Sequence, residues 1–149
     1  MRNISLKQAG LGVLVSLLAI QAVPVHTDNP AVVPSQTIYV IQPMPAHVES
    51  ILDASCSNCH SDRTNWPWYS RVAPVSWVVA HDVHQGRSQM NFSQWGSYPQ
   101  QRQEQKLEEI CEQIVNGDMP DGKYLLVHRR ARLTQEQKDA VCGWIETVR

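Results

Sequence analysis

Apolar side chains recur three and four residues apart in four stretches of the chain, a spacing that is typical of amphipathic helices. The first stretch covers about residues 46–55, and the second about residues 74–85, where Gly86 is expected to end the helix. The third covers about residues 99–117, and the fourth residues 134–148. The chain is therefore expected to fold as an all-α protein.

Helix boundaries and buried faces can be assigned within these stretches. Gly117 should end the third helix, because glycine readily adopts the left-handed conformation that closes a helix. Thr134 with Gln137 three residues later forms a capping box that should begin the fourth. The side chains assigned to the core are Val48, Ile51, Leu52, Leu107, Ile110, Cys111, Ile114, Val115, Val141, Trp144, Ile145 and Val148.

The stretch from residue 23 to residue 45 is rich in proline and shows no helical period. It contains five of the nine prolines, so we expect a linker or an extended strap. Within it, Ile38-Tyr39-Val40-Ile41 could pair as a short strand or lie over the domain, but one strand cannot make a sheet. The expected organisation is therefore a strap followed by one helical domain over residues 46–149.

The N-terminus has the pattern of an export segment, with Arg2 and Lys7 followed by an uncharged, largely apolar stretch over residues 8–25. Ala22 offers a small residue before a cleavage point, but the residue two positions earlier is a poor match. Residues 1–22 are therefore either a signal peptide or an N-terminal membrane anchor near the minimum spanning length. Both alternatives place the rest of the protein outside the cytoplasm, in the periplasm.

Composition excludes several classes of function. A chain of 149 residues supports one domain with one modest core. Its formal net charge is -1, and loss of the basic leader would leave a mildly acidic protein. We therefore expect no nucleic-acid partner. The sequence also contains no phosphate-binding glycine loop and no pattern that resembles a hydrolase.

The pentapeptide Cys56-Ser57-Asn58-Cys59-His60 carries the clearest chemistry. Two thiols three positions apart, followed at once by an imidazole, are the pattern that covalent attachment of haem c requires. On one helical turn the two thiols face the same way, so both can form thioethers to one porphyrin while His60 binds the iron. The pattern predicts one haem c per chain, bound through Cys56, Cys59 and His60.

A zinc site and a redox dithiol are the alternatives for a Cys-x-x-Cys pattern. A structural zinc site needs a second pair of ligands, but Cys111 and Cys142 lie singly and far downstream. A thioredoxin-like dithiol needs a strand before the motif, and the stretch around Cys56 has no run of β-branched residues. Covalent haem is therefore the preferred interpretation.

The second axial position of the iron decides between electron transfer and ligand chemistry. Met119 is the first candidate, because a thioether just before Pro120, in a loop after a helix ended by glycine, resembles the Met-Pro loop of small cytochromes c. His81, His84 and His128 are rivals for this position. A position left open by the protein is a further alternative.

Aromatic side chains ahead of the second helix could line a haem pocket, although ordinary core packing would also account for them. The candidate walls are Trp66, Trp68, Tyr69 and Trp77, with Arg63 or Arg71 beside a propionate, while Met44 and Met90 are assigned to packing. The basic run over residues 128–132 could orient an acidic redox partner or be a solvated loop.

The two remaining cysteines are expected to form a disulfide. Cys111 lies on the apolar face of its helix, and Cys142 lies beside Val141. Because haem uses two of the four cysteines and exported proteins keep few free thiols, we expect a Cys111–Cys142 bond between the third and fourth helices. Two buried free thiols are the alternative.

Several blocks of the sequence resemble one bacterial family, the haem-binding domain family with a CxxCH and WPWYS core. The similar blocks are residues 21–30, 56–62, 64–77, 86–87, 91–95 and 117–120, with Tyr124 and His128. The resemblance implies a small exported monohaem domain that is often tethered at its N-terminus. Arg129-Arg130 departs from the family, which usually has a proline and an acidic residue there.

These observations favour a small cytochrome c-like helical domain around one covalent haem. The expected function is that of a periplasmic c-type cytochrome, soluble or membrane-tethered, which exchanges single electrons with an unidentified redox partner protein and is not itself an enzyme. The expected axial ligands are His60 and Met119. The alternatives are a haem-based sensor or peroxidase-like enzyme with an open iron position, and an interaction module in which haem is structural.

Overall fold

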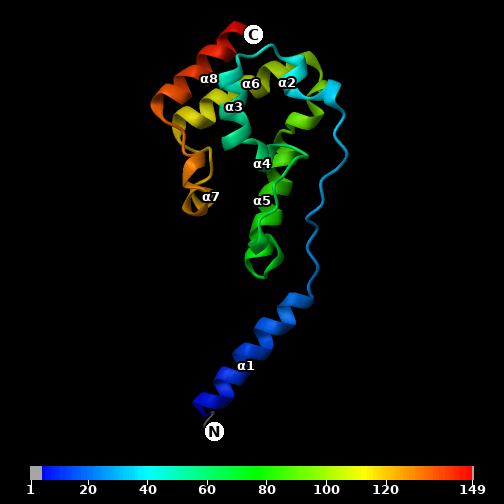
Figure 1. Cartoon of the computed structure of the whole chain (residues 1–149), viewed down its shortest axis with the longest axis vertical. Helices are drawn as coiled ribbons and strands as arrows, with labels where there is room; N and C mark the ends of the chain where they lie inside the picture. The colour runs from blue at the N-terminus through cyan, green and yellow to red at the C-terminus, as the bar shows by residue number, and fades with distance from the viewer. Residues whose placement is uncertain (1–4, 149) are drawn as a thin grey trace. The chain divides into compact units, whose positions relative to one another are not determined.

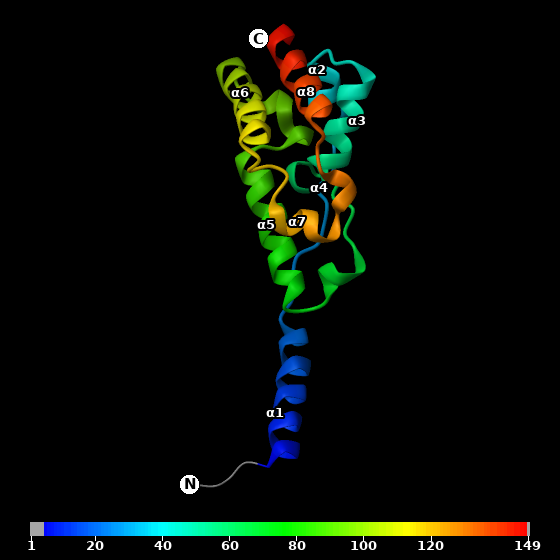
Figure 2. The same ribbon diagram turned by 90° about the vertical axis from the view of Figure 1, so that its left-hand side faces the viewer.

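The computed structural model describes residues 5–148 as two compact units. The core unit consists of residues 29–65 and 83–148, and the leader unit consists of residues 5–28 and 66–82. Arg2, which contributes to the expected export signal, and Arg149, which ends the expected domain, lie outside the described residues. Each unit is described separately below (Figures 1 and 2).

The described residues are helical, and residues 5–148 contain no strand. The leader unit contains α1 (Leu6–Ala19), the 3-10 turns η1 (Ile20–Ala22) and η3 (Trp68–Arg71), and the first half of α5 (Val75–Gln89). The core unit contains the rest of α5 and the elements η2 (Pro34–Gln36), α2 (Ile38–Ile41), α3 (Ala46–Ser55), α4 (Ser57–His60), η4 (Phe92–Ser97), α6 (Gln100–Asn116), α7 (Gly122–Val127), η5 (Arg129–Ala131) and α8 (Gln135–Val148).

The hydrophobic core of the core unit lies where α8 packs against both α3 and α6 (Figure 1). Apolar side chains from these three helices meet residues of the strap and of η4 there. The main members are Ile38, Val48, Ile51, Leu52, Met90, Phe92, Trp95, Leu107, Ile110, Ile114, Val141, Trp144 and Ile145. The Trp144 indole N–H also donates to the carbonyl of Pro43 at 2.8 Å, which fixes the strap to α8.

Three of the four predicted helices have the expected boundaries and faces. Helix α3 covers the expected residues, and α6 ends at Gly117, whose φ of 81° is left-handed. At the start of α8, the Thr134 hydroxyl accepts from the Gln137 N–H, and the Gln137 side chain accepts from the Thr134 N–H. The assignment of Val115 to the buried face was wrong, because its side chain is 58% exposed.

Two local predictions were also wrong. Gly86 does not end α5, which continues to Gln89. Ile38–Ile41 is neither a strand nor extended: it forms the short helix α2, in which the Ile41 N–H donates to the Thr37 carbonyl at 3.1 Å. With no strand beside it, this segment pairs its backbone internally while Ile38 is fully buried. Tertiary packing therefore overrides the strand preference of these residues.

The leader unit is built around an apolar helix that buries none of its side chains. Leu11, Leu14 and Leu18 of α1 are each more than half exposed. Just after this helix, the Gln21 side chain forms two hydrogen bonds of 3.0 Å with the backbone N–H and carbonyl of Ala73. No helix within residues 5–148 has both the length and the apolar character needed to cross a bilayer.

The predicted disulfide is confirmed. Cys111 on α6 and Cys142 on α8 are bonded, with their Cα atoms 5.2 Å apart. The bond joins two helices that already pack against each other, and both cysteines contact the hydrophobic core. It therefore fixes the C-terminal part of the core unit.

Replacing both cysteines with serine should lower the free energy of unfolding by about 2 to 4 kcal/mol, because the cross-link restricts the unfolded chain. Urea denaturation followed by circular dichroism measures this change. Adding a reductant should destabilise the native protein by a similar amount and leave the C111S/C142S variant unaffected. Equal stability of the native protein with and without reductant would contradict the prediction.

Candidate functional site

The CxxCH pentapeptide forms one helical turn between α3 and the loop that follows. The Cys56 N–H bonds to the Leu52 carbonyl at 2.9 Å, so the turn continues directly from α3. The N–H groups of Cys59 and His60 both donate to the Cys56 carbonyl, at 3.2 and 3.0 Å. Neither Cys56 nor Cys59 forms a disulfide, and both are half-buried. The local backbone is therefore the single turn that the sequence spacing predicted.

The environment of Cys56 favours an uncharged sulfur. Burial, together with the neighbouring Cys59, raises the pKa of the Cys56 thiol to about 12. The thiol is therefore neutral at physiological pH. A thioether is also neutral, so this environment would accept the sulfur of a haem linkage without burying a charge.

His60 is held in the form that a metal ligand needs. Its Nδ1 lies 3.2 Å from the Met90 carbonyl, and since a carbonyl can only accept, this contact favours the tautomer that carries its proton on Nδ1 and has Nε2 as the basic nitrogen. Burial lowers the pKa of His60, against the opposing effect of the Met90 and Gly86 backbone, so the ring is neutral. The ring also lies beside Phe92, with 6.2 Å between ring centroids. This arrangement fits an axial ligand of iron.

A close approach of α5 positions the pentapeptide from one side. Gly86 is buried, and a Cβ atom on it would lie 2.5 Å from the backbone oxygen of Cys59 and 3.1 Å from the Cys59 Cβ. No side chain fits in this space, so glycine is required where α5 crosses α4. Gly86 was expected to end the helix because glycine is common at helix ends. Its close approach to Cys59 could not be predicted, because packing between distant segments leaves no local signal in the sequence.

The loop after His60 is fixed by a buried carboxylate. Asp62 is 3% exposed, and its two carboxylate oxygens accept from the side-chain amides of Asn91 and Gln94, at 2.8 and 3.0 Å. Its backbone N–H donates to the Ser93 hydroxyl at 3.0 Å, and the Arg87 Nε lies 3.6 Å from the carboxylate. This set, which we call the Asp62 cluster, joins the end of α4 to α5 and η4.

Arg87 extends the Asp62 cluster to the strap. Its guanidinium donates to the Ser61 carbonyl at 2.8 Å, to the Thr64 hydroxyl at 2.9 Å and to the Asn29 side chain at 2.7 Å. Asn29 in turn donates to the Thr64 carbonyl at 2.9 Å. Several of these residues lie in the blocks that resemble the family, but no local sequence pattern indicates that they contact one another.

The structure gives the candidate axial ligands different surroundings. The Met119 side chain is 38% exposed, and its N–H donates to the Gln113 carbonyl at 3.2 Å in the loop after α6. His81 and His84 are exposed on α5. His128 is half-buried and stacks on Tyr124, with ring centroids 4.2 Å apart. Met119 and these histidines therefore remain candidates, and Met119 as axial ligand stays a prediction.

The other predicted pocket residues have mixed outcomes. Met90 is buried and Met44 packs against the core, as predicted. Arg63, proposed beside a propionate, lies 3.2 Å from Asp53 and over the Tyr39 ring. The aromatic candidates belong to the leader unit, where Trp68 is 78% exposed and packs edge to face with Tyr69. The assignments of Trp66, Trp68, Tyr69, Trp77 and Arg71 to the haem pocket stay predictions.

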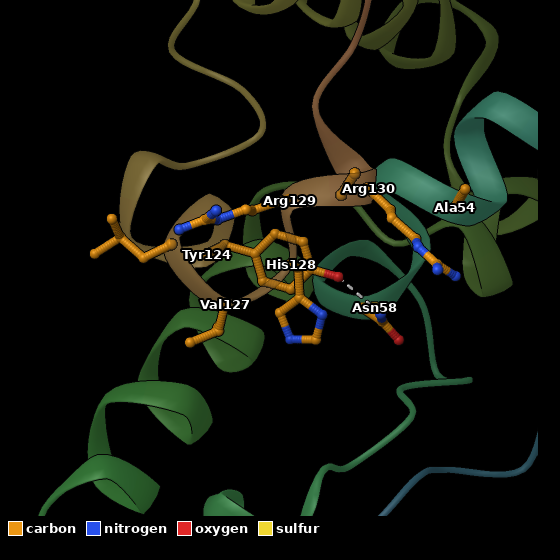
Figure 3. Close-up of a pocket in the computed structure, with 9 residues that line it drawn as sticks. Ala54, Asn58, Tyr124, Val127, His128, Arg129 and Arg130 are labelled. Carbon is orange, nitrogen blue, oxygen red and sulfur yellow. Dashed lines mark hydrogen bonds between the residues drawn. The ribbon is translucent and has the colours of Figure 1, made fainter.

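A cavity of about 440 Å³ lies beside the pentapeptide in the core unit (Figure 3). Asn58 lies at one side of it and donates to the Tyr124 hydroxyl at 2.9 Å, while His128 lies under the Tyr124 ring. We call it the arginine cavity, and its lining residues are Ala54, Asn58, Tyr124, Leu126, Val127, His128, Arg129, Arg130 and Ala131. The basic run over residues 128–132 was recognised in the sequence, but the cavity that it helps to line was not predicted.

Comparison with known proteins agrees with this site. The model of a family described as haem-binding domain matches residues 15–147. The chain therefore belongs to the haem-binding domain family, and we describe it as a haem-binding protein. No curated protein and no solved structure matches the chain. Within residues 5–148, no group of three or more His, Cys, Asp or Glu side chains is arranged to hold a metal ion by itself.

Replacing Gly86 with alanine should destabilise the protein by about 1 to 3 kcal/mol and reduce the fraction of chains that carry haem, because the new methyl group collides with the Cys59 backbone. Urea denaturation and the ratio of haem to protein absorbance measure the two effects. Gly143→Ala in α8 is the matched control, since a Cβ there meets nothing within 4 Å. The control should be neutral or stabilising by up to about 1 kcal/mol, and equal behaviour of the two variants would contradict the role of Gly86.

Proposed function

We propose that the protein is a monohaem c-type cytochrome that carries single electrons outside the cytoplasm. The observation that carries the proposal is the His60 geometry: the contact of Nδ1 with the Met90 carbonyl favours Nε2 as the nitrogen that would bind iron, and Cys56 and Cys59, which form no disulfide, lie on the same helical turn. In this proposal Cys56 and Cys59 form the thioethers, and His60 is one axial ligand. Membership of the haem-binding domain family supports the cofactor itself.

The protein would fix the haem and limit what reaches the iron. Haem supplies a metal centre that gains or loses one electron. The Met90 carbonyl orients the His60 ring, and the Asp62 cluster holds the loop that follows it. In the proposal Met119 closes the second axial position, so that small ligands are excluded and the iron is limited to electron transfer. An open position would instead favour a sensor or a peroxidase-like enzyme.

The proposed location is the periplasm, with the N-terminal segment acting as signal peptide or membrane tether. Helix α1 is apolar and buries none of its side chains, which supports an export function for this segment. The Cys111–Cys142 disulfide supports an oxidising compartment. The partner in this proposal is another redox protein of the same compartment.

Protein produced with a haem-maturation system should carry one haem that acid and organic solvent do not extract. Replacing Cys56 and Cys59 with serine should abolish this linkage, because no other described residue offers a free thiol. Intact mass and in-gel haem staining measure it. The C111S/C142S variant serves as the matched control and should keep its haem. A native mass equal to that of the bare polypeptide, with zinc bound, would falsify the proposal.

Replacing Met119 with alanine should open the iron to carbon monoxide and lower the reduction potential, since a thioether ligand favours the reduced iron. Absorption spectra with and without carbon monoxide, together with a redox titration, measure both effects. Met44→Ala is the control, because Met44 packs against the hydrophobic core and should not alter the spectrum. An unchanged spectrum and potential in Met119→Ala would transfer the role to His81, His84 or His128.

A further inference from the structure

The arginine cavity is lined by exposed apolar side chains and by positively charged arginine side chains. Leu126 and Val127 are 75% and 65% exposed, so two neighbouring apolar side chains face solvent at the cavity. Arg129 and Arg130 are exposed, and neither has an ion-pair partner among residues 5–148. No acidic residue lines the cavity. The surface therefore attracts anions and also gains by covering apolar area.

Asn58 connects the cavity to the part of the pentapeptide that would carry the two thioethers. This residue lies between the two cysteines, and its amide is bonded to Tyr124 of the cavity wall. The thioethers of haem c form at the two vinyl groups, and the propionates lie on the opposite half of the macrocycle. In the proposed holoprotein the arginine cavity would therefore lie beside the thioether half of the haem, and the charges of Arg129 and Arg130 would be available to an anion from outside the chain.

We propose that the arginine cavity is the docking site for an acidic redox protein that exchanges electrons with the haem. This inference rests on the proposed function and adds the site and charge of the partner. Carboxylates of the partner would pair with Arg129 and Arg130, and a small apolar contact would cover Leu126 and Val127. Charge complementarity around a small contact suits a transient encounter, because it speeds association more than it strengthens binding.

The proposed reaction is the transfer of one electron between the haem and the partner. When the partner is the oxidant, the ferrous haem becomes ferric and the partner centre gains one electron. No bond forms or breaks, and no proton moves. What the cavity contributes is proximity, because a partner seated on it lies beside the segment that carries both thioethers.

Oxidation of the full-length ferrous holoprotein by two small reagents of opposite charge tests the proposal. Hexacyanoferrate(III) is a trianion that stands in for an acidic partner, and tris(phenanthroline)cobalt(III) is a trication. Stopped-flow rates are measured at low and high ionic strength for the native protein and for R129Q/R130Q. The matched control is R102Q/K138Q, which removes the same charge from α6 and α8 outside the cavity.

At low ionic strength, R129Q/R130Q should slow oxidation by the trianion about threefold or more and speed oxidation by the trication, and high salt should remove both differences. The R102Q/K138Q control should change much less. Equal effects of the two variants, or no effect of R129Q/R130Q, would overturn the docking site while leaving the electron carrier intact. Absence of electron transfer to either reagent would instead overturn the proposed function. Unchanged spectra and thermal unfolding confirm that each variant is folded and loaded with haem.

Discussion

The buried carboxylate of Asp62 is the interaction on which the geometry of the site depends. A charge at 3% exposure is stable only when it is paired and hydrogen-bonded, and here the Asn91 and Gln94 donors bond to the carboxylate while the Arg87 guanidinium, with its Nε at 3.6 Å, supplies the opposite charge. These donors come from α5 and η4, about 25 to 32 residues further along the chain. Loss of one member leaves a buried charge without its partner, so the cluster forms as a unit. The direction in which the chain leaves His60 is fixed as a result.

The same logic applies along the pentapeptide, where each position after Cys56 meets a different part of the core unit. The Ser57 hydroxyl forms a hydrogen bond of 2.6 Å with the Tyr39 hydroxyl of the strap, and the Asn58 amide donates to the Tyr124 hydroxyl at the wall of the arginine cavity. Cys59 packs closely against Gly86 of α5, and the Met90 carbonyl orients the His60 ring. Three separate segments, namely the strap, α7 and the end of α5 with Met90, thus converge on one helical turn. Such preorganisation keeps the imidazole in one orientation before any ligand binds.

The sequence allowed the regular parts of this fold to be predicted, because they depend on local rules. Helices α3, α6 and α8 follow from apolar period and capping, and the disulfide follows from cysteine number and helix faces. The single helical turn formed by Cys56, Cys59 and His60 likewise follows from their spacing. The close packing at Gly86 and the formation of α2 could not be predicted, because they depend on contacts between distant segments. Helix α7 was missed although the Asp121 side chain caps its first turn locally. The Asp62 cluster was missed because its members, too, are distant in the sequence.

Under the proposed function, the four cysteines impose opposite demands on the maturation of the chain. Cys111 and Cys142 must be oxidised to form their bond, whereas thioether formation needs both thiols of the pentapeptide reduced. The bonded pair is 31 positions apart and meets only when α6 and α8 have folded, while the other pair already lies within one turn. An indiscriminate oxidant would therefore link the near pair first. Under the proposed function, correct assembly would need a reductant aimed at that pair alone, and the chain would have to mature where oxidising and reducing power are supplied side by side.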